Sequence, residues 1–569
     1  MNPAITESVA RREVGFRWPQ HVGIGCLFLG IVLLFAAAPP PTEGAGLVAA
    51  DHELASAAGA EVMARGGNAV DAAVAAALAA GVVQPPSSGL GGGGFAVVVD
   101  GPDWDVLDFR EVAPAGATRD MYLEDGEVVS GRSRRGALAV AVPGESRGLA
   151  RLHQDHGRLP AAAVAAPAIR YAQRGFEVGY HLARSLAKTE HSEVLQLFQV
   201  DGTVAERGTT VRRPALARTL RRWVATRGED LHVGPGASAI AAEVRDGGGI
   251  VDEADLAAWQ PTERTPVVTS FRGYTVVTMP APSSGGLFLA QMLRVLEGYD
   301  LESVEFGSSD YLHLLTEVLK HAFADRAHHV GDMAWSDDPS SRLLSDDRIT
   351  AIRASIWPGR TFPPDYYAPI IDGPTDAGTQ HISVVDRDGM AVALTSTVNT
   401  SFGSGVVVED IGLILNNQMD DFAAAPGVPN AYGLVGGEAN AIGPGRKPLS
   451  SMSPTVVLDP SGEVVLVVGA SGGPRIISST LQVLLGVLVF DLTPTEAVSA
   501  DRIHHQWQPD KLFLDPSLAP DVRRALEARG HDIAVRRDGS SVQVIARDPA
   551  TGLARGASDP RKGGRPVAP

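Results

Sequence analysis

Two segments of this sequence place a hydroxyl side chain where it could act as a nucleophile. In one of them, residues 469–473 read Gly-Ala-Ser-Gly-Gly, with a valine-rich strand expected before Ser471 and a helix after it. A serine nucleophile elbow requires that order, and Asp501 with His504 or His505 could complete a catalytic triad. The same glycines could also form a loop whose backbone N–H groups face an oxyanion.

The other candidate is Thr379, which stands between a proline-rich segment, residues 333–378, and a segment rich in Val, Ile and Thr. A threonine at this point could simply cap a strand, or its hydroxyl could attack a carbonyl carbon. Too few residues follow Ser471, and too few regular strand–helix units precede it, for an ordinary α/β-hydrolase. We therefore treat a Ser471 esterase as the weaker hypothesis.

A glycine-rich run, residues 89–94, matches the dinucleotide-binding pattern Gly-x-Gly-x-x-Gly. That site needs a strand before the glycines and a helix after them, because the phosphates bind at the helix N-terminus. Here a helix is expected before the glycines and a strand after them. We interpret the run as a tight turn whose backbone packs against other backbone.

The elements that must position these residues follow from hydrophobic periodicity and turn residues. Residues 51–83 are mostly small and apolar, and Gly66, Gly67 and Asn68 divide them into two helices. Further helices are expected within residues 144–175, 185–250, 285–298, 311–325 and 476–490, and strands within residues 95–100, 267–277, 381–416, 455–458 and 464–468. Strands flanked by long helices predict a layered α/β architecture.

Two local patterns make sharper predictions. In the strand around residue 394, period-two alternation puts one set of side chains on one face and the next set on the other: Val392, Leu394 and Ser396 against Ala393, Thr395 and Thr397. Residues 333–378 contain six prolines, many Asp residues and few periodic apolar positions. They are expected to form an extended surface segment.

Composition excludes several classes of protein. The 569 residues are 44% hydrophobic, which is too apolar for wholesale disorder. The net charge of −17 disfavours nucleic-acid binding, since an acidic surface repels phosphates. The single cysteine, Cys26, excludes an intrachain disulfide, a cysteine zinc site and an iron–sulfur cluster.

The N-terminus reads as a targeting segment. Three arginines precede an uncharged apolar run over residues 22–38, which is typical of either a signal peptide or an uncleaved membrane anchor. Pro39 would follow a cut after Ala38 and is a poor residue there, so both alternatives stay open. We expect residues 1–46 to direct export, and the protein to be periplasmic or extracellular, either released or anchored through residues 22–38.

A series of short blocks, in order from Gly46 to about Pro560, resembles the γ-glutamyltranspeptidase (glutathione hydrolase) family of N-terminal-nucleophile hydrolases. The blocks are GGNAVDAAVA (66–75), GLGGGGF (89–95), DFREVAP (108–114), PAPSSGG (280–286), FADR (323–326), NNQMDDF (416–422), PGVPNAYGLVGGEANAIGP (426–444), PLSSMSPT (448–455) and HHQW (504–507).

The resemblance implies a four-layer αββα sandwich formed by two chains cut from one precursor. Cleavage between Gly378 and Thr379 would separate a large segment, residues 47–378, from a small segment, residues 379–569. The new α-amino group of Thr379, with a reference pKa of about 7.7–8.0, could serve as general base for its own hydroxyl. No histidine base is then needed, and His381 is expected to be structural.

The resemblance also assigns the machinery of acyl transfer. Thr397 matches the threonine that hydrogen-bonds the nucleophile, and Gly472 and Gly473 match the pair whose N–H groups form the oxyanion hole. Pro474 departs from the serine usual after that pair, and it removes one N–H. Tyr432 lies in a loop that resembles the family's lid over the site.

The remaining assignments concern the charged head of a γ-glutamyl substrate. Arg110 matches the residue that grips the α-carboxylate, since its fork suits bidentate pairing, and Ser450 and Ser451 add hydroxyl donors. Three further residues match the site for the α-ammonium: Asn399, Gln418 and Asp421. Both charges need partners, because burying an unpaired charge is costly.

The resemblance therefore implies an exported, autoprocessed enzyme that transfers the γ-glutamyl group of glutathione or related compounds to water, an amino acid or a peptide. No cofactor or metal is implied, and the two segments would remain together as a heterodimer. A cephalosporin (glutaryl) acylase of the same fold is the alternative, although Asp421 and Asn399 speak against it. A Ser471 esterase, or an exported binding protein without turnover, is less favoured.

Overall fold

The computed structural model describes residues 42–569 except residues 336, 370–378, 425–427, 429, 435 and 538. Most of the expected export segment, with its apolar run at residues 22–38, and Gly378 of the expected cleavage site therefore lie outside the described residues. Within residues 42–569 less those gaps, no helix is both long enough and apolar enough to span a membrane.

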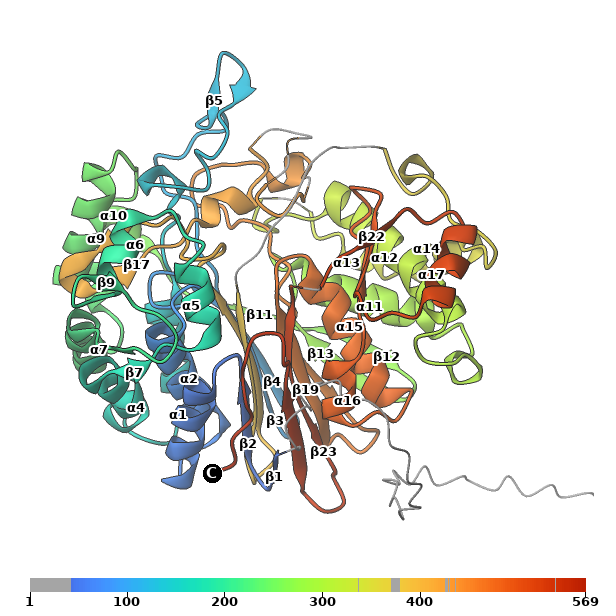
Figure 1. The fold of residues 1–569 in the computed structure, drawn as a ribbon, viewed down its shortest axis with the longest axis horizontal. Helices are drawn as coiled ribbons and strands as arrows, with labels where there is room; N and C mark the ends of the chain where they lie inside the picture. Colours follow the sequence, from blue (N-terminus) through green and yellow to red (C-terminus); the bar gives the residue numbers. More distant parts are fainter. Residues whose placement is uncertain are drawn as a thin grey trace, which may run out of the picture. The chain divides into compact units, whose positions relative to one another are not determined.

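Two antiparallel sheets pack face to face at the centre of the structure (Figure 1). The first has six strands in the order β11 (Thr262–Arg264), β4 (Asp103–Phe109), β3 (Gly93–Asp100), β15 (Ala391–Thr397), β14 (Gln380–Val385) and β2 (Leu47–Ala50). The second has seven, in the order β1 (Thr42–Gly44), β24 (Ala554–Ser558), β23 (Ser541–Arg547), β19 (Val464–Ser471), β18 (Thr455–Leu458), β13 (Tyr274–Thr278) and β12 (Val267–Phe271). Strands β14 and β15 lie against β19 across the interface between the sheets.

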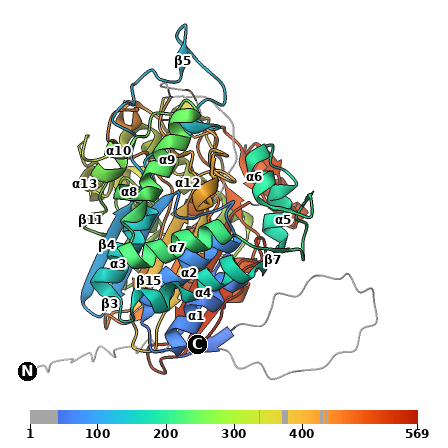
Figure 2. The ribbon, with the colours of Figure 1, turned by 90° about the vertical axis from the view of Figure 1, so that its left-hand side faces the viewer.

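Helices cover the outer face of each sheet. The six-stranded sheet carries α1 (Glu53–Ala64), α2 (Ala69–Val83) and α3 (Glu145–His156), with α4 (Ala161–Arg174) and α7 (Pro214–Thr226) packed outside them (Figure 2). The seven-stranded sheet carries α11 (Ser284–Leu296), α15 (Arg475–Leu488) and α16 (Pro494–Ser499), with α12 (Ser309–His329) packed on α11. The predicted four-layer αββα sandwich is confirmed.

The alternation predicted for β15 is also confirmed. Val392 and Leu394 pack into the hydrophobic cluster that contains α1 and α2. Ala391 and Ala393 pack into the other large cluster. That cluster fills the space between the two sheets and also contains side chains of α11, α12 and α15. The strand is buried on both faces, which accounts for its nearly continuous apolar sequence.

The break between α1 and α2 lies where the glycines predicted it. Asn68 caps α2 by a reciprocal pair of hydrogen bonds with Asp71. Helix α2 is alanine-rich because it is buried on nearly all sides, and small side chains let its neighbours approach. A Cβ on Gly59 of α1 would lie 2.8 Å from the carbonyl oxygen of Ala72, which shows how closely these two helices pack.

The prediction of an extended surface segment over residues 333–378 is wrong for part of that range. Residues 340–355 contain α13 (Ser340–Leu343) and α14 (Asp346–Ser355). Ser345 caps α14, and Ile349 and Ile352 are buried against the core. The prolines lie on either side of this helix and do not interrupt it. Two buried positions are too few to give a hydrophobic periodicity that predicts a helix.

The remaining helices and strands complete the fold. The helical ones are η1 (Ala137–Ala139), α5 (Tyr180–Leu186), α6 (Ser192–Leu197), α8 (Asp230–Val233), α9 (Pro235–Asp246), α10 (Glu253–Ala258), η2 (Leu301–Ser303), η3 (Pro364–Tyr366), η4 (Glu409–Ile411), η5 (Gln418–Asp421), η6 (Glu438–Asn440) and α17 (Pro520–Ala528). The strands are β5 (Leu123–Glu124), β6 (Glu127–Val128), β7 (Phe176–Glu177), β8 (Gln199–Val200), β9 (Thr203–Val204), β10 (Thr210–Val211), β16 (Val407–Val408), β17 (Leu413–Ile414), β20 (Ile503–His504), β21 (Leu512–Leu514) and β22 (Ile533–Val535).

Candidate active site

Thr379 lies directly before β14, and the register of the sheet brings it to Thr397. Gln380 pairs with Ser396 in the antiparallel β14–β15 ladder, so the next pair outward is Thr379 and Thr397. Their hydroxyl oxygens are 3.3 Å apart, and both side chains are buried. Eighteen residues of separation in the sequence therefore become a direct contact through strand pairing alone.

The contact continues from Thr397 into the loop after β15. The hydroxyl of Thr397 accepts a hydrogen bond of 2.8 Å from the backbone N–H of Asn399. Asn399 has a left-handed backbone, with φ of 78°, which asparagine tolerates better than most residues. The Tyr432 hydroxyl donates to the Asn399 backbone oxygen at 2.7 Å, which fixes the expected lid residue against this turn.

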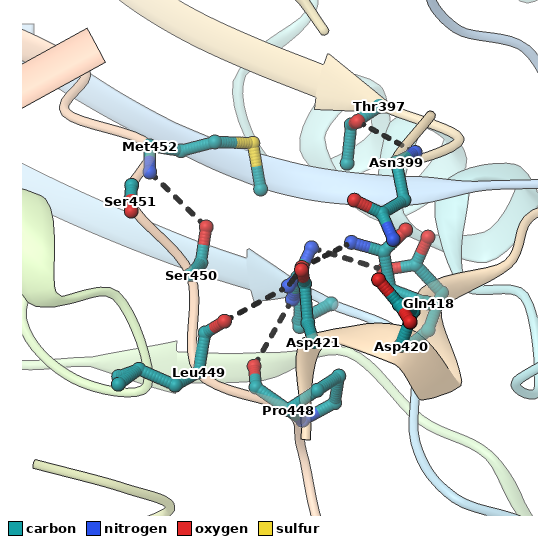
Figure 3. A network of polar contacts seen from close by, with 12 residues as sticks. Thr397, Asn399, Gln418, Asp420, Asp421, Pro448, Leu449, Ser450, Ser451 and Met452 are labelled. Carbon is teal, nitrogen blue, oxygen red and sulfur yellow. Dashed lines mark hydrogen bonds and ion pairs between the residues drawn. The ribbon is translucent and has the colours of Figure 1, made fainter. Parts of the chain in front are cut away.

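Arg110 and Asp421 form the charged part of the site. Arg110 follows β4, is 1% exposed, and places Nη2 2.5 Å from Oδ2 of Asp421. Its guanidinium also donates to the backbone oxygens of Pro448 and Leu449, while Gln418 Nε2 donates to Asp421 Oδ2 at 3.1 Å (Figure 3). The two charges are thus held together inside the protein.

These residues line one pocket of about 300 Å³. Its lining comprises Arg110, Arg326, Thr379, Thr397, Asn399, Gln418, Asp421, Tyr432, Leu434, Leu449, Ser450, Ser451, Met452, Gly473 and Ile476. Every site residue that the family resemblance assigns, among those that the structure describes, belongs to this lining except Gly472. Segments from both sides of the expected cleavage point therefore build the pocket jointly.

Gly472 and Gly473 connect β19 to α15 beside the pocket. Both have positive φ, 132° and 58°. A Cβ on Gly472 would lie 2.7 Å from the Cα of Ser540, so only glycine fits there. Pro474 is the residue before α15, with φ of −60°, a position that a proline tolerates without strain.

The structure contradicts the Ser471 triad. The Ser471 hydroxyl donates to Asp51 at 2.9 Å and receives a hydrogen bond from Lys562 at 3.0 Å. His504 uses its two ring nitrogens on Ser478 and Gln506, and His505 uses its ring nitrogens on Asp510 and the backbone of Trp507. Asp501 accepts from Ser517.

The glycine run at residues 89–94 is a packing turn, as its order of elements predicted. A Cβ on Gly91 would lie 2.2 Å from the backbone oxygen of Ile414, and one on Gly92 would lie 2.0 Å from that of Thr397. A Cβ on Gly94 would lie 2.2 Å from the backbone oxygen of Thr395. The glycines therefore let β3 approach the end of β15, the strand that carries Thr397.

Burial shifts the pKa of several groups at or near the pocket. It raises the pKa of Asp421 to about 6, against the opposing effect of Arg110. It raises the pKa of Glu111 to about 7, again opposed by Arg110. Burial also lowers the pKa of His381 to about 3, so this imidazole is neutral at physiological pH.

His381 has a structural place. Its Nδ1 lies 2.8 Å from the Thr395 hydroxyl and its Nε2 lies 3.2 Å from the Ser383 hydroxyl. A Cβ on Gly469 would lie 2.3 Å from the ring, so the imidazole fills the space between the two sheets at that glycine. It does not line the pocket.

Two cations at the site, Arg326 and Lys562, have no role assigned from the sequence. Arg326, on α12, lines the pocket and donates to the hydroxyls of Ser284 and Ser451. Lys562 donates to the backbone oxygen of Thr379, and lies 2.7 Å from Asp51. The FADR block contained Arg326, but Lys562 lies 183 residues from Thr379 and belongs to no motif.

Among the described residues, one group has the side chains and spacing of a metal site. It consists of His313, Glu317 and His531, and it lies outside the pocket around Thr379.

Comparison with known proteins places this geometry in a family. Residues 55–568 match the family model described as gamma-glutamyltranspeptidase. A glutathione hydrolase proenzyme of Escherichia coli is 40% identical over 526 residues, which cover 91% of this chain and 90% of the relative. The proenzyme of Pseudomonas aeruginosa is 39% identical over 559 residues, covering 93% of this chain and 98% of that protein.

Solved structures agree. A cephalosporin acylase from Bacillus halodurans superposes with a TM-score of 0.83 and 27% identity, covering 95% of this chain and 99% of that one. A gamma-glutamyltranspeptidase from Pseudomonas nitroreducens superposes with a TM-score of 0.53 and 35% identity, covering 56% of this chain and 96% of that one. With a family model that matches nearly the whole described chain, and relatives of about 40% identity along their length, the protein belongs to the gamma-glutamyltranspeptidase family.

Proposed function

We propose that this protein is an autoprocessed γ-glutamyltransferase and glutathione hydrolase with Thr379 as its nucleophile. The observation that carries the proposal is the contact of 3.3 Å between the Thr379 and Thr397 hydroxyls in the same pocket as the Arg110–Asp421 pair. The proposed nucleophile and the two charged side chains that would pair with a zwitterionic head group therefore line one small cavity.

Processing is the first proposed step. The Thr379 hydroxyl attacks the carbonyl carbon of Gly378, the peptide nitrogen leaves as an amine, and water hydrolyses the resulting ester. The products are the segment that ends at Gly378 and the small segment that begins at Thr379, which stay associated as a heterodimer. The names of the bacterial relatives, glutathione hydrolase proenzymes, support a precursor of this kind.

Substrate binding follows from the charges in the pocket. Arg110 and the hydroxyls of Ser450 and Ser451 receive the α-carboxylate, and Asp421, with Asn399 and Gln418, receives the α-ammonium. Because Arg110 and Asp421 already lie side by side, the pocket offers a positive and a negative group in fixed positions. Such preorganised charges lose little free energy on rearrangement when substrate binds.

Acyl transfer then uses the new N-terminus. The free amine of Thr379 takes the proton of its own hydroxyl, and the oxygen attacks the γ-carbonyl carbon of glutathione. The N–H groups of Gly472 and Gly473 stabilise the oxyanion, and Thr397 holds the nucleophile in place. Cysteinylglycine leaves with a proton from the amine, and water or the amine of an amino acid or peptide attacks the γ-glutamyl ester.

The cephalosporin acylase from Bacillus halodurans supports a second candidate, a glutaryl amidase, through its similarity over nearly the whole chain. A glutaryl group has the carboxylate but lacks the α-ammonium. Asp421, at the end of η5 and held by Arg110 and Gln418, offers a negative charge to the α-ammonium, and a glutaryl group would leave that charge without a ligand partner. This favours the γ-glutamyl substrate.

The matched pair of γ-glutamyl and glutaryl p-nitroanilides tests the choice, since the two differ only in the ammonium. We expect kcat/KM for the γ-glutamyl compound to be at least about 100-fold higher, in line with the cost of leaving a site's charged group unpaired. A preference for the glutaryl compound supports the acylase instead. The variant Thr379→Ala must abolish turnover of both, and retention of turnover would contradict a Thr379 nucleophile.

We also propose export to the periplasm or the extracellular space through residues 1–46, with residues 22–38 as either a cleaved signal or an anchor. The basic flank and uncharged run of that segment support the proposal. Fractionation of cells that express the full chain or residues 42–569, which keep β1 in its sheet, tests it. Identical distribution of the two forms would contradict it.

A further inference from the structure

A second cluster of titratable side chains lies where α12 meets the segment between α17 and β22. Helices α12 and α17 lie side by side (Figure 1). His313 and Glu317 are one turn apart on α12, and His531 follows α17. All three are buried, with exposed fractions of 3%, 0% and 5%. One nitrogen of each histidine and one carboxylate oxygen of Glu317 lie within 4.8 Å of one another.

The hydrogen bonds of His313 fix which of its nitrogens has a free lone pair. Its Nε2 lies 2.8 Å from the backbone oxygen of Trp357. A carbonyl can only accept, so Nε2 carries the proton and Nδ1 offers its lone pair. That lone pair points at Nε2 of His531, 2.7 Å away.

Glu317 is oriented from behind in the same way. One carboxylate oxygen accepts from the Thr361 hydroxyl at 2.6 Å, and the other accepts from the Tyr367 hydroxyl at 2.5 Å. Each oxygen keeps a further lone pair. Metal-binding histidines and carboxylates in proteins are held by outer hydrogen bonds of this kind, from a backbone carbonyl or from hydroxyl groups.

We propose that His313, Glu317 and His531 bind a divalent ion of the zinc type, at a site separate from the pocket around Thr379. Two imidazoles and one carboxylate suit Zn²⁺ or Co²⁺ and are a poor set for Ca²⁺ or Mg²⁺, which take oxygen ligands. A water molecule completes four-coordination. On binding, His531 moves its ring proton from Nε2 to Nδ1, so both lone pairs reach the ion with no net change of charge on the rings.

The cluster needs a small adjustment to hold the ion. Tetrahedral ligands at the usual Zn–N distance are about 3.3 Å apart, so the two rings must separate by roughly half an ångström from their hydrogen-bonded distance. Rotation of the two imidazoles, which lie edge to face, supplies a movement of that size.

Charges around the cluster favour a cation on balance. Two positive groups lie near the cluster. Arg529 is paired with Asp310, and the ammonium of Lys320 donates to Thr361 and to the backbone oxygen of Phe362. Asp510, at 3.2 Å from that ammonium, offsets it. His505 beside Asp510 has its pKa lowered to about 4 by burial and is neutral. The carboxylate of Glu317 therefore leaves the cluster net negative before an ion binds.

The position of the ligands gives the ion a structural role. His313 and Glu317 precede the proposed cleavage point, and His531 follows it. Thr361 and Tyr367, which orient Glu317, lie in the last stretch that the structure describes before residue 370. A bound ion would join the two chains after cleavage, a consequence that rests on the proposed processing, whereas the binding itself does not.

Titration of the purified protein after treatment with EDTA tests the site. We expect isothermal calorimetry to show one Zn²⁺ per protein with a Kd of about 1 μM or below. Co²⁺ should give the visible absorption bands of a four-coordinate ion, and Zn²⁺ should raise the melting temperature by about 2 °C or more. His531→Asn and Glu317→Gln should each weaken binding at least about 10-fold. His328→Asn, on the same helix but outside the cluster, should bind as the wild type does.

Absence of binding by the wild-type protein below about 1 mM Zn²⁺ would overturn the proposal. So would equal affinity in the wild type and both cluster variants, which would place the ion elsewhere. If the variants do not fold, anomalous diffraction from a Co²⁺-soaked crystal of the wild-type protein decides: a peak between the three side chains supports the site, and a peak elsewhere or none overturns it. Hydrolysis of the γ-glutamyl anilide, measured on the same protein, reports separately on the function of Thr379.

Discussion

The Arg110 guanidinium and the Asp421 carboxylate lie 2.5 Å apart, and both groups are almost completely shielded from solvent. A buried ion pair is costly to form, and removing one partner leaves an uncompensated charge. The pair is therefore explained better by what it can bind than by what it adds to stability. It presents the two charges that the head group of an α-amino acid requires.

The first prediction concerns Asp421→Asn. The variant removes the proposed partner of the substrate ammonium and the closer of the two carboxylates beside Arg110, the other being Glu111. We expect kcat/KM for a γ-glutamyl anilide to fall by about 100- to 1,000-fold, equivalent to about 3–4 kcal/mol. The value of kcat/KM for the glutaryl analogue should fall much less. The control variant Glu438→Gln, which changes an exposed carboxylate, should leave kcat/KM for both substrates unchanged. Equal losses on both anilides would show that Asp421 does not read the ammonium.

The second prediction concerns the pH dependence of stability. Burial raises the pKa of Glu111 from 4.5 to about 7. Because the folded pKa exceeds the unfolded one, the stability from this group is fully present below about pH 4.5 and is lost as the pH rises through 7. The shift is worth about 3 kcal/mol over that window, and Asp421 acts in the same direction.

The substrate-free protein should therefore melt at a higher temperature at pH 5.5 than at pH 8. In Glu111→Gln, whose side chain stays neutral, the difference between the two pH values should shrink. Differential scanning fluorimetry at both pH values provides the measurement. An unchanged difference in the variant would mean that Glu111 does not change its protonation between pH 5.5 and pH 8, which would contradict the prediction.

The third prediction concerns Lys562→Met. This ammonium joins Asp51, Ser471 and the backbone oxygen of Thr379 in a buried network. Without it Asp51 lacks its cationic partner, which should cost about 3 kcal/mol or more of stability, and the backbone at Thr379 loses a fixed donor. We expect slower processing and a lower melting temperature.

Lys511→Met, which removes an exposed lysine paired with Asp532, is the matched control and should behave as the wild type. Processing can be followed on a denaturing gel during expression. Normal processing in Lys562→Met would restrict this lysine to a role in stability.

The fourth prediction compares two glycines with positive φ. Gly472→Ala places a Cβ 2.7 Å from the Cα of Ser540, at φ of 132°. We expect a loss of at least about 3 kcal/mol of stability, from strain and displacement of the loop that carries the proposed oxyanion donors. Gly462→Ala, at φ of 91° in open space, should cost about 1 kcal/mol and leave kcat unchanged. Similar kcat values for the two variants would contradict the oxyanion role.

Much of the site was predictable because its residues stand in recognisable blocks. Strands flanked by long helices predicted a layered α/β fold, and the family resemblance supplied the four layers. Thr379 and Thr397 flank one hairpin, and its register brings them together. The missed helix α14 shows the limit of periodicity, since Ile349 and Ile352 are its only fully buried side chains. The prolines of residues 333–378 lie before and after α14, so they predict the irregular flanks of that segment and not the helix at its centre.

Contacts across long sequence separations could not be predicted. Lys562 reaches Thr379, and His531 reaches His313, only because the two sheets and their helices fold over one another. Neither pair leaves a local pattern. The direct pairing of Arg110 with Asp421 was also not foreseen, because each had been assigned to a different end of the substrate.

The N-terminal residue of the small chain tests the central claim most directly. Purified protein should give two bands on a denaturing gel, and sequencing of the smaller band should begin Thr-Gln-His-Ile, the residues from Thr379 onward. Thr379→Ala should give a single uncleaved band without γ-glutamyl hydrolase activity. A full-length wild-type protein that hydrolyses the γ-glutamyl anilide, or a small chain with a different first residue, would contradict Thr379 as the self-generated nucleophile.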